Sequence, residues 1–524
     1  MTTVSPKTLH DWMNDRAELA VLDVREAGEF GIGHLLFAVP VPYSRFEFEL
    51  DRLVPRRATR LVLCDAEASD IGQRAARQAA GLGYEHVYVL EGGVEGWRRA
   101  GYRLFAGVNV PSKTFGELVE ETHHTPRIAA SDLHDMLARG ERVVVVDGRP
   151  FPEYGKMNIP GSICCPNGEL ALRISRIVED ETTPIVVNCA GRTRSIIGAQ
   201  TLRELGVRNP VFALENGTQG WSLAGFELER GSTRRYPAAP PAEHLAERVE
   251  AATALAVRHG VRSLGPEEAT QWIADPERTV YVLDVRTPEE FEEGALAGAR
   301  NAPGGQLVQA TDQWLAVKGA RVLLLDYDGI RAPVIAQWLR RMGWDAHTMR
   351  AVPGIDVSVS RNGSDVAATL PLPAIVSPEV LEEWRRSDAC RIIDVRPSMD
   401  FRRAHVPGSK WSIRPRIVED VPTGANRIVL VSDDSRMVRM AARELSGRED
   451  LSLHCLDGGY RRWADEGRPS EASPDVPSDQ DAIDYLFFVH DRHDGNLDAA
   501  RQYLAWEQGL TAMLEYRERE RFNP

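Results

Sequence analysis

The stretch Val186-Val187-Asn188-Cys189-Ala190-Gly191-Arg192-Thr193-Arg194-Ser195 decides both the fold and the chemistry of this chain. An apolar strand ends at a lone cysteine, a short polar loop with two arginines follows, and Ser195 opens a helical run. A thiolate in such a loop is stabilised by backbone N–H groups, by the dipole of the next helix and by nearby guanidinium groups. We therefore predict that Cys189 is a nucleophile. The alternative is a buried structural cysteine, which the two arginines disfavour.

The composition bounds the classes of protein to consider. The chain has 524 residues and a net charge of −14, and this length predicts roughly three to five domains. The negative charge and the absence of basic runs argue against nucleic acid as a partner. The N-terminus has no signal-peptide pattern, and no apolar run is long enough to cross a membrane. Six cysteines lie scattered without metal-site or disulfide spacing, so we expect a cytoplasmic protein without a metal.

One pattern is written four times along the chain. Each copy begins with an apolar strand that ends in Asp-x-Arg, followed by an acidic residue next to an aromatic one and a small-residue turn. A second apolar strand and a helix follow, and three copies close with a Gly-rich turn that leads to a tryptophan. The Asp-x-Arg pairs are Asp23–Arg25, Asp147–Arg149, Asp284–Arg286 and Asp394–Arg396.

Short apolar strands that alternate with helices predict an α/β fold, in which each copy is a central parallel sheet flanked by helices. Ligands of such sheets bind at the carboxyl ends of the strands, where the pattern places Cys189. The predicted modules are residues 1–108, 125–231, 262–360 and 374–470. Residues 232–261 predict a Pro-rich linker and a helix. Residues 482–522 predict a helical tail, folded as a hairpin against the body or against a second subunit of a homodimer.

Together, the Asp-x-Arg opening, the Cys-x-Gly-x-x-Arg-Ser loop and the Gly-rich turn to tryptophan resemble the rhodanese-like sulfurtransferases, as four tandem modules. The resemblance implies that Cys189 attacks a sulfur donor, carries the sulfur as a persulfide and passes it to a thiol or to cyanide. It implies no metal or organic cofactor. The loop from Cys189 to Arg194 has the length of the sulfur-transferring members. Related phosphatases and arsenate reductases have a loop one residue longer, which disfavours phosphatase chemistry.

The resemblance also assigns roles to other residues of the second module. Asp147 and Arg149 match the opening motif, where they form a structural charged pair beside the loop. The loop backbone would hold the donor and the persulfide, and its arginines would bind an anionic donor such as thiosulfate. Arg173 is a further candidate for anion binding, with a solvated helix arginine as the alternative. The predicted substrate-binding residues are Ala190, Gly191, Arg192, Thr193, Arg194, Ser195 and Arg173.

The other three modules depart from the pattern at the loop, where we assign Cys64, Asp326 and Val431 to the position of the nucleophile. Three carboxylates follow Cys64, and they would raise the thiol pKa and repel an anionic donor. Cys64 is therefore a weak candidate. A carboxylate or a valine cannot carry a persulfide, so the third and fourth modules are predicted to be inactive. Their loop-end arginines, Arg331 and Arg436, would cap or brace the fold.

Two questions keep alternative answers. Cys164 and Cys165 either resolve a persulfide on Cys189 or pack along their strand. The chain is either an enzyme that acts on a small donor, or a relay and binding scaffold in which a protein partner feeds sulfur to Cys189. Thiosulfate, mercaptopyruvate, glutathione persulfide and a protein persulfide are all candidate donors.

Overall fold

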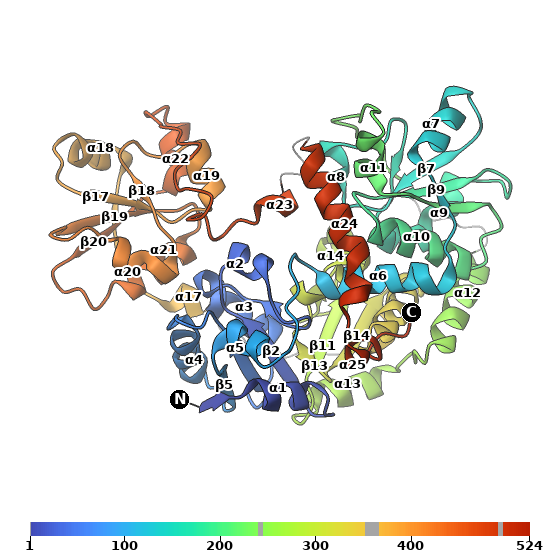
Figure 1. Cartoon of the computed structure of the whole chain (residues 1–524), viewed down its shortest axis with the longest axis horizontal. Helices are drawn as coiled ribbons and strands as arrows, with labels where there is room; N and C mark the ends of the chain where they lie inside the picture. Colours follow the sequence, from blue (N-terminus) through green and yellow to red (C-terminus); the bar gives the residue numbers. More distant parts are fainter. Residues whose placement is uncertain (1, 239–244, 352–365, 491–495) are drawn as a thin grey trace. The chain divides into compact units, whose positions relative to one another are not determined.

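The computed structural model describes residues 2–238, 245–351, 366–490 and 496–524. Its parallel sheets follow the fourfold repeat, and helices lie against each sheet (Figure 1). The chain divides into two compact units. One contains the first and fourth modules, and the other contains the second and third modules with the long helix of the tail.

The first module forms its sheet in the order β1-β5-β4-β2, with β3 paired to β2. The strands are β1 (Thr2–Val4), β2 (Leu19–Asp23), β3 (Val39–Pro40), β4 (Arg60–Cys64) and β5 (Val87–Leu90). The helices are α1 (Pro6–Met13), α2 (Ala27–Ile32), α3 (Phe46–Leu53), α4 (Ile71–Gly81) and α5 (Gly93–Arg99), with a 3-10 turn at Tyr43–Arg45.

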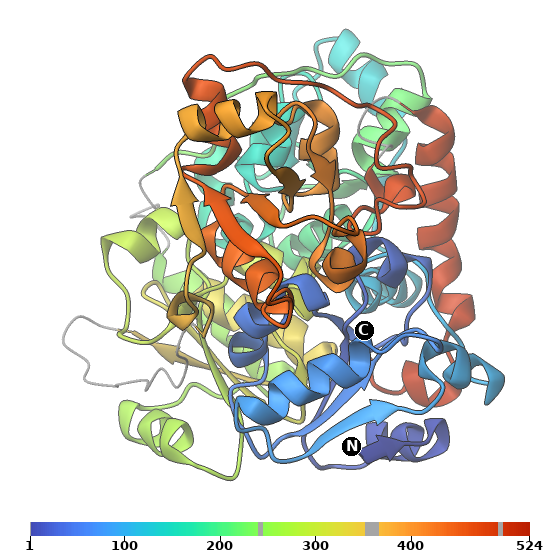
Figure 2. The same cartoon turned by 90° about the vertical axis from the view of Figure 1, so that its left-hand side faces the viewer.

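The fourth module repeats this topology in the order β16-β20-β19-β17-β18 and is coloured orange in Figure 2. Its strands are β16 (Ala374–Val376), β17 (Arg391–Asp394), β18 (Lys410–Trp411), β19 (Arg427–Val431) and β20 (Ser452–Leu456). Its helices are α18 (Pro378–Arg386), α19 (Ser398–Arg403), α20 (Ile417–Asp420), α21 (Ser435–Glu444) and α22 (Gly459–Asp465), and α17 (Val366–Thr369) precedes them. The buried Arg414 guanidinium donates to Glu47 at 2.8 Å, which ties this module to the first.

The second module forms the sheet β6-β10-β9-β7-β8. The strands are β6 (Arg127–Ile128), β7 (Val144–Asp147), β8 (Ile163–Cys164), β9 (Ile185–Asn188) and β10 (Val211–Leu214). The helices are α7 (Ala130–Ala138), α8 (Phe151–Lys156), α9 (Asn167–Ile177), α10 (Thr193–Glu204) and α11 (Gly217–Leu223), and α6 (Val110–His123) precedes the module. Strand β9 is buried along its whole length, as a central strand covered on both faces must be, and its carboxyl end leads into Cys189.

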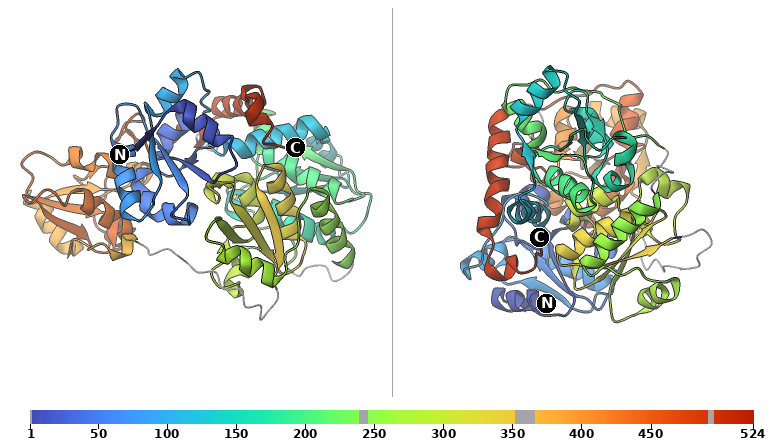
Figure 3. Two further views of the ribbon diagram at one scale, coloured as in Figure 1. Left: turned by 90° about the horizontal axis from the view of Figure 1, so that it is seen from below. Right: turned by 90° about the vertical axis from the view of Figure 1, so that its right-hand side faces the viewer.

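The third module forms the sheet β12-β11-β14-β15, whose yellow strands are seen in Figure 3. The strands are β11 (Val280–Asp284), β12 (Arg300–Asn301), β14 (Arg321–Asp326) and β15 (Asp345–Arg350), and the short β13 covers Val317–Lys318. The helices are α13 (Pro266–Ala274), α14 (Pro288–Glu293), α15 (Gly304–Gln309) and α16 (Arg331–Arg341). Helix α12 (Leu245–Arg258) precedes the module and lies within residues 232–261, where the sequence predicts a linker with a helix. The degenerate Gly turn after Ala351 lies outside the described residues.

The tail is helical, as predicted, but its described part is not a hairpin. It contains one long helix, α24 (Leu497–Met513), between the single-turn helices α23 (Phe487–His490) and α25 (Tyr516–Arg519). Helix α24 packs against α6 and against α11 of the second module. Among the described residues, no helix is long and apolar enough to cross a membrane.

Candidate functional site

The Asp-x-Arg pair of the second module ties the end of β7 to the end of the next helix. Both side chains are buried, and Arg149 donates to Asp147 from Nε at 2.9 Å and from Nη2 at 2.7 Å. Nη2 also donates to the carbonyl of Met157, at the C-terminus of α8, at 2.6 Å. In the other modules, the arginine of the pair likewise donates from Nη2 to the carbonyl of the residue eight positions after it. Asn188 donates to Asp147 at 2.7 Å, which extends this network to the residue before Cys189.

Cys189 lies between β9 and α10 and is 2% exposed. The Ser195 hydroxyl, from the first turn of α10, donates to the Cys189 sulfur at 3.1 Å. The carbonyls of Cys189 and Ala190 accept hydrogen bonds from the N–H groups of Thr218 and Gln219, at 2.8 Å and 3.1 Å. Because both donors lie in the first turn of α11, this helix fixes the orientation of the loop's peptide groups.

The Gly-rich turn of the repeat needs glycine because the backbone carbonyl of the loop position lies directly against it. Gly217 has a φ of +55°, and a Cβ on it would lie 2.3 Å from the Cys189 carbonyl oxygen. Gly93 and Gly459 stand in the same relation to the carbonyls of Asp65 and Ser432, at 2.2 Å and 2.3 Å. A side chain at these positions would displace the loop.

We expect Gly217→Ala to lower the rate of sulfur transfer roughly a hundredfold, since displacement of a reacting group by about 1 Å can cost this much. The matched control is Gly225→Ala. Gly225 also has a positive φ, +85°, but a Cβ there would meet no described atom within 4 Å, so it carries only the backbone cost of about 1–2 kcal/mol. Transfer rates and melting temperatures of both variants test this. Equal rates would show that the carbonyl contact does not position the loop.

The strand pairing identifies the residue of each module that corresponds to Cys189. In each module, the residue that follows the Asp of the Asp-x-Arg pair donates its N–H to a carbonyl at the end of the strand that leads into the loop. This carbonyl belongs to Asn188 in the second module, to Cys64 in the first and to Val431 in the fourth. Cys64 and Val431 therefore correspond to Asn188. The register corrects both sequence assignments by one residue, because the loop positions are Asp65 and Ser432.

The third module has Asp326 at the loop position, because the corresponding strand carbonyl belongs to Leu325. The Asp326 carboxylate accepts hydrogen bonds from the N–H groups of Gly329 and Ala332, at 3.1 Å and 2.8 Å. Asp65 of the first module accepts hydrogen bonds from the N–H groups of Ala66 and Gly72, at 2.7 Å each. In both modules burial, the largest effect, raises the pKa of the carboxyl group above its ordinary value, although these N–H groups lower it.

The cysteines outside the loop are buried. Burial, more than the neighbouring Asp23, raises the pKa of Cys64 well above its ordinary value. Burial also raises the pKa of Cys164 to about 12 and that of Cys165 well above its ordinary value. These environments favour the packing interpretation for Cys164 and Cys165, since a neutral, buried thiol is a poor nucleophile. Cys390 and Cys455 lie in hydrophobic core clusters.

Arg192 is bound by helix α6, an element that the sequence interpretation missed. Its guanidinium is buried and donates to both carboxylate oxygens of Glu117, at 2.7 Å and 2.8 Å, and also to Glu120. Burial, opposed by Arg192, raises the pKa of Glu117 to about 7. The structure therefore assigns Arg192 to an ion pair that holds the loop, and its predicted contact with a donor stays a prediction.

Arg194, the second arginine of the loop, is paired with an acidic residue of the same module. Its guanidinium makes a two-pronged contact with Glu153 of α8, at 3.0 Å and 2.9 Å. Burial lowers the pKa of Arg194, but the negative charge of Glu153, with a smaller contribution from Cys189, raises this pKa above its ordinary value. The carbonyl of Arg194 accepts a hydrogen bond from Asn167 at 2.8 Å. Arg194 is thus held in place through its side chain by Glu153 and through its carbonyl by Asn167.

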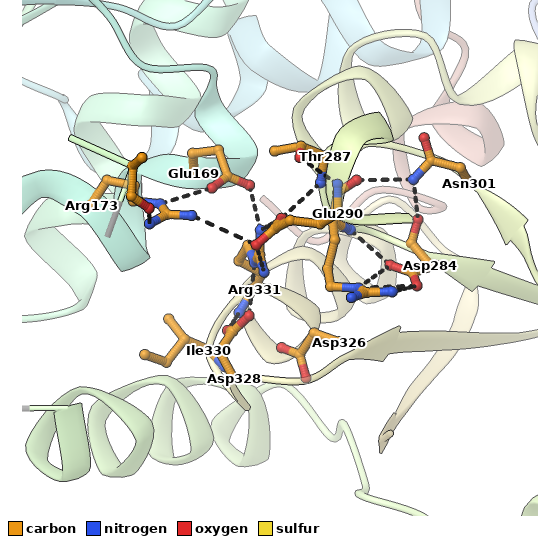
Figure 4. A network of polar contacts seen from close by, with 12 residues as sticks. Glu169, Arg173, Asp284, Thr287, Glu290, Asn301, Asp326, Asp328, Ile330 and Arg331 are labelled. Carbon is orange, nitrogen blue, oxygen red and sulfur yellow. Dashed lines mark hydrogen bonds and ion pairs between the residues drawn. The ribbon is translucent and has the colours of Figure 1, made fainter. Parts of the chain in front are cut away.

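Arg173 belongs to a polar network between the second and third modules (Figure 4). It is buried, which rules out a solvated arginine. It donates to Glu169 at 3.2 Å and to the carbonyl of Ala238 at 2.7 Å, and it lies 3.7 Å from Glu290. These contacts favour a structural role for Arg173, and donor binding stays a prediction for it.

Arg331 of the third module corresponds to Arg194, because each stands five residues after its loop position and pairs with the acidic residue of its own acidic-aromatic motif. For Arg331 this residue is Glu290. Arg331 also reaches Glu169 of the second module at 2.8 Å (Figure 4). The loop arginine of the third module therefore braces the two modules, as the predicted structural role requires.

The fold and the cysteine loop together define an α/β protein of parallel-sheet modules, one of which has a cysteine after the carboxyl end of a central strand. A rhodanese-like domain model matches residues 5–100, 129–224, 265–353 and 377–466. The chain therefore belongs to the rhodanese-like family, with four such domains. Among the described residues, no group of three His, Cys, Asp or Glu side chains is arranged to hold a metal ion.

Similar proteins include one of matching length. The crystal structure of a thiosulfate sulfurtransferase from Pseudomonas aeruginosa is 39% identical, with a TM-score of 0.91 over 100% of this chain and 99% of that chain. An uncharacterised protein of Synechocystis is 30% identical over 109 residues, or 21% of this chain. An HTH-type transcriptional regulator of Mycobacterium tuberculosis is 31% identical over 144 residues, or 25% of this chain. The chain spans 59% of the length of each of these two curated relatives.

Proposed function

We propose that this protein is a cytoplasmic enzyme that moves sulfane sulfur from a small anionic donor such as thiosulfate to a thiophilic acceptor, through a persulfide on Cys189. The observation that carries the proposal is the set of residues at the four loop positions, all within the described part of the chain. Only Cys189 can carry sulfur there, since the others are Asp65, Asp326 and Ser432. The likeness in sequence and length to the Pseudomonas aeruginosa thiosulfate sulfurtransferase supports this donor class.

In the first half-reaction the Cys189 thiolate attacks the outer sulfur of thiosulfate. A sulfur–sulfur bond forms, the bond within thiosulfate breaks, and sulfite leaves with the electron pair. The Arg194 guanidinium supplies positive charge beside the reacting sulfur, and this charge attracts the donor and stabilises the leaving anion. The Ser195 hydroxyl, which donates to the sulfur at 3.1 Å, helps to hold the thiolate form.

In the second half-reaction cyanide or a thiolate attacks the outer sulfur of the persulfide. The persulfide bond breaks, the sulfur leaves on the acceptor, and the electron pair returns to the Cys189 thiolate. Since cysteine carries the sulfur covalently, neither step requires a metal or an organic cofactor.

The burial of Cys189 favours a small donor over a protein partner. The side chain is 2% exposed, and its loop lies against α6 and α24 through Thr193 and Gly191. Thiosulfate and cyanide are small enough to reach such a sulfur, whereas a cysteine on a folded partner must bring its backbone with it. The relay interpretation would need this loop to open.

Steady-state kinetics with thiosulfate and cyanide test the proposal against the relay. We expect turnover without a partner protein, with parallel double-reciprocal lines when both substrates are varied, as a double displacement requires. The comparison is the rate at which the purified chain takes sulfur from a persulfidated protein. Poor turnover with thiosulfate, together with fast transfer from the persulfidated protein, would contradict the proposal and support the relay.

A further inference from the structure

Two helices outside the rhodanese-like modules enclose the loop of Cys189. Helices α6 and α24 cover residues 110–123 and 497–513, and neither falls within the segments that match the family model. They pack against each other, and α6 also packs against α10 (Figures 1 and 3). The active loop therefore depends on side chains that the module itself does not supply.

Glu507 of α24 contacts the loop that follows Cys189. Its side chain is fully buried, and Oε1 accepts the Thr193 hydroxyl at 2.7 Å and lies 3.2 Å from the Lys113 ammonium. A Cβ on Gly191 would lie 3.0 Å from Glu507 Oε2 and 3.4 Å from the ring of Tyr503. The helix thus touches two residues of the loop, one by a hydrogen bond to a charged acceptor and one by close packing.

The charged side chains around the loop are paired with one another. Lys113 of α6 is buried against Glu507 and lies 4.9 Å from the centre of the Tyr503 ring. Glu117 and Glu120 of α6 both accept from the guanidinium of Arg192. Glu507 is thus one of several carboxylates whose ion pairs hold the loop against α6 and α24.

We propose that Glu507 is a positioning residue for sulfur transfer, which holds the segment from Gly191 to Thr193 so that Cys189 and Arg194, on its two sides, keep the geometry the donor needs. This inference rests on the proposed function. It predicts that the C-terminal helix is part of the working enzyme. Loss of the Glu507 bond should loosen the loop, expose the sulfur and slow transfer, while the four sheets stay folded.

The test compares Glu507→Ala, Glu507→Gln and Gln508→Ala in the full chain. Gln508 is the matched control, because it is the next residue of α24 and is exposed. Two quantities are measured: kcat and KM for thiosulfate, and the rate at which iodoacetamide alkylates Cys189, followed by peptide mass. Alkylation reports the exposure of the sulfur and does not depend on sulfur transfer.

We expect Glu507→Ala to lower kcat about tenfold and to raise the alkylation rate by a similar factor. Glu507→Gln should keep most of the activity, because its amide oxygen still accepts the Thr193 hydroxyl. Gln508→Ala should match the wild type in both measurements. Thr193→Val removes the same hydrogen bond and keeps the carboxylate beside Lys113, so it should reproduce faster alkylation even where Glu507→Ala fails to fold.

The outcomes separate this inference from the proposed function. If the wild type transfers no sulfur but Glu507→Ala and Thr193→Val still speed alkylation, the proposed function fails and the positioning of the loop stands. If the wild type transfers sulfur and both variants behave like Gln508→Ala, the inference is overturned. It is also overturned if their loss of activity equals the fraction of unfolded protein measured by thermal melting.

Discussion

Replacement of Cys189 by serine is expected to abolish sulfur transfer, with a fall in turnover of about a thousandfold or more. Serine is nearly isosteric with cysteine and can accept the Ser195 hydrogen bond, so the loop should keep its form. Its hydroxyl cannot form a persulfide, however, and none of the other loop positions offers a sulfur. Steady-state turnover of thiosulfate and cyanide measures this effect.

The control for this variant is Cys64→Ala, since Cys64 is the cysteine nearest to a loop position in another module. Cys64 is buried with a raised pKa, so its removal should leave turnover close to that of the wild type. Loss of activity in Cys64→Ala with activity retained in Cys189→Ser would move the chemistry to the first module.

Arg331→Ala is expected to destabilise the unit that contains the second and third modules by about 3–5 kcal/mol, the usual cost of removing one partner from a buried ion pair. Arg331 is 3% exposed and compensates Glu169, Glu290 and Asp328. Its removal takes away the cation that pairs with Asp328 and leaves Arg173 as the cation beside Glu169 and Glu290 at the contact between two modules. Urea denaturation of the full chain measures the effect as an earlier unfolding transition.

Arg436→Ala is the matched control, because Arg436 stands near the loop end of the fourth module but its side chain is 47% exposed, paired with an exposed Asp434. Exposed ion pairs contribute less than about 1 kcal/mol, so the transition should hardly move. Equal shifts for the two variants would mean that Arg331 does not brace the modules as the contacts in Figure 4 indicate.

The four sheets could be predicted from the sequence because each strand is a short apolar run with a polar boundary. The boundary is also where the prediction failed. In the second module Asn188 ends the apolar run, and the nucleophile follows it. In the first and fourth modules Cys64 and Val431 are apolar and occupy the Asn188 position. The apolar run there continues through the position that Asn188 holds in the second module, and the sequence assignment places its last residue in the loop, one residue too early.

Helix α6 and its part in the site could not be found from apolar periodicity. Its buried residues include Ser112, Lys113, Thr114 and Glu117, so the face that packs on the loop is polar and charged. Glu507 is hidden for the same reason, since it is a buried charge on a helix that otherwise packs through apolar residues. Such groups are recognised only with their partners, which lie far away in the sequence. The pairing of the first module with the fourth depends on long-range contacts in the same way.

The central claim is that one cysteine of this four-module chain carries the sulfur. The most direct test is the intact mass of the wild type and of Cys189→Ala after brief exposure to thiosulfate and removal of the excess. The account predicts a gain of one sulfur atom, roughly 32 Da, in the wild type and no gain in the variant. A gain that persists in Cys189→Ala, or its absence from an active wild type, would contradict it.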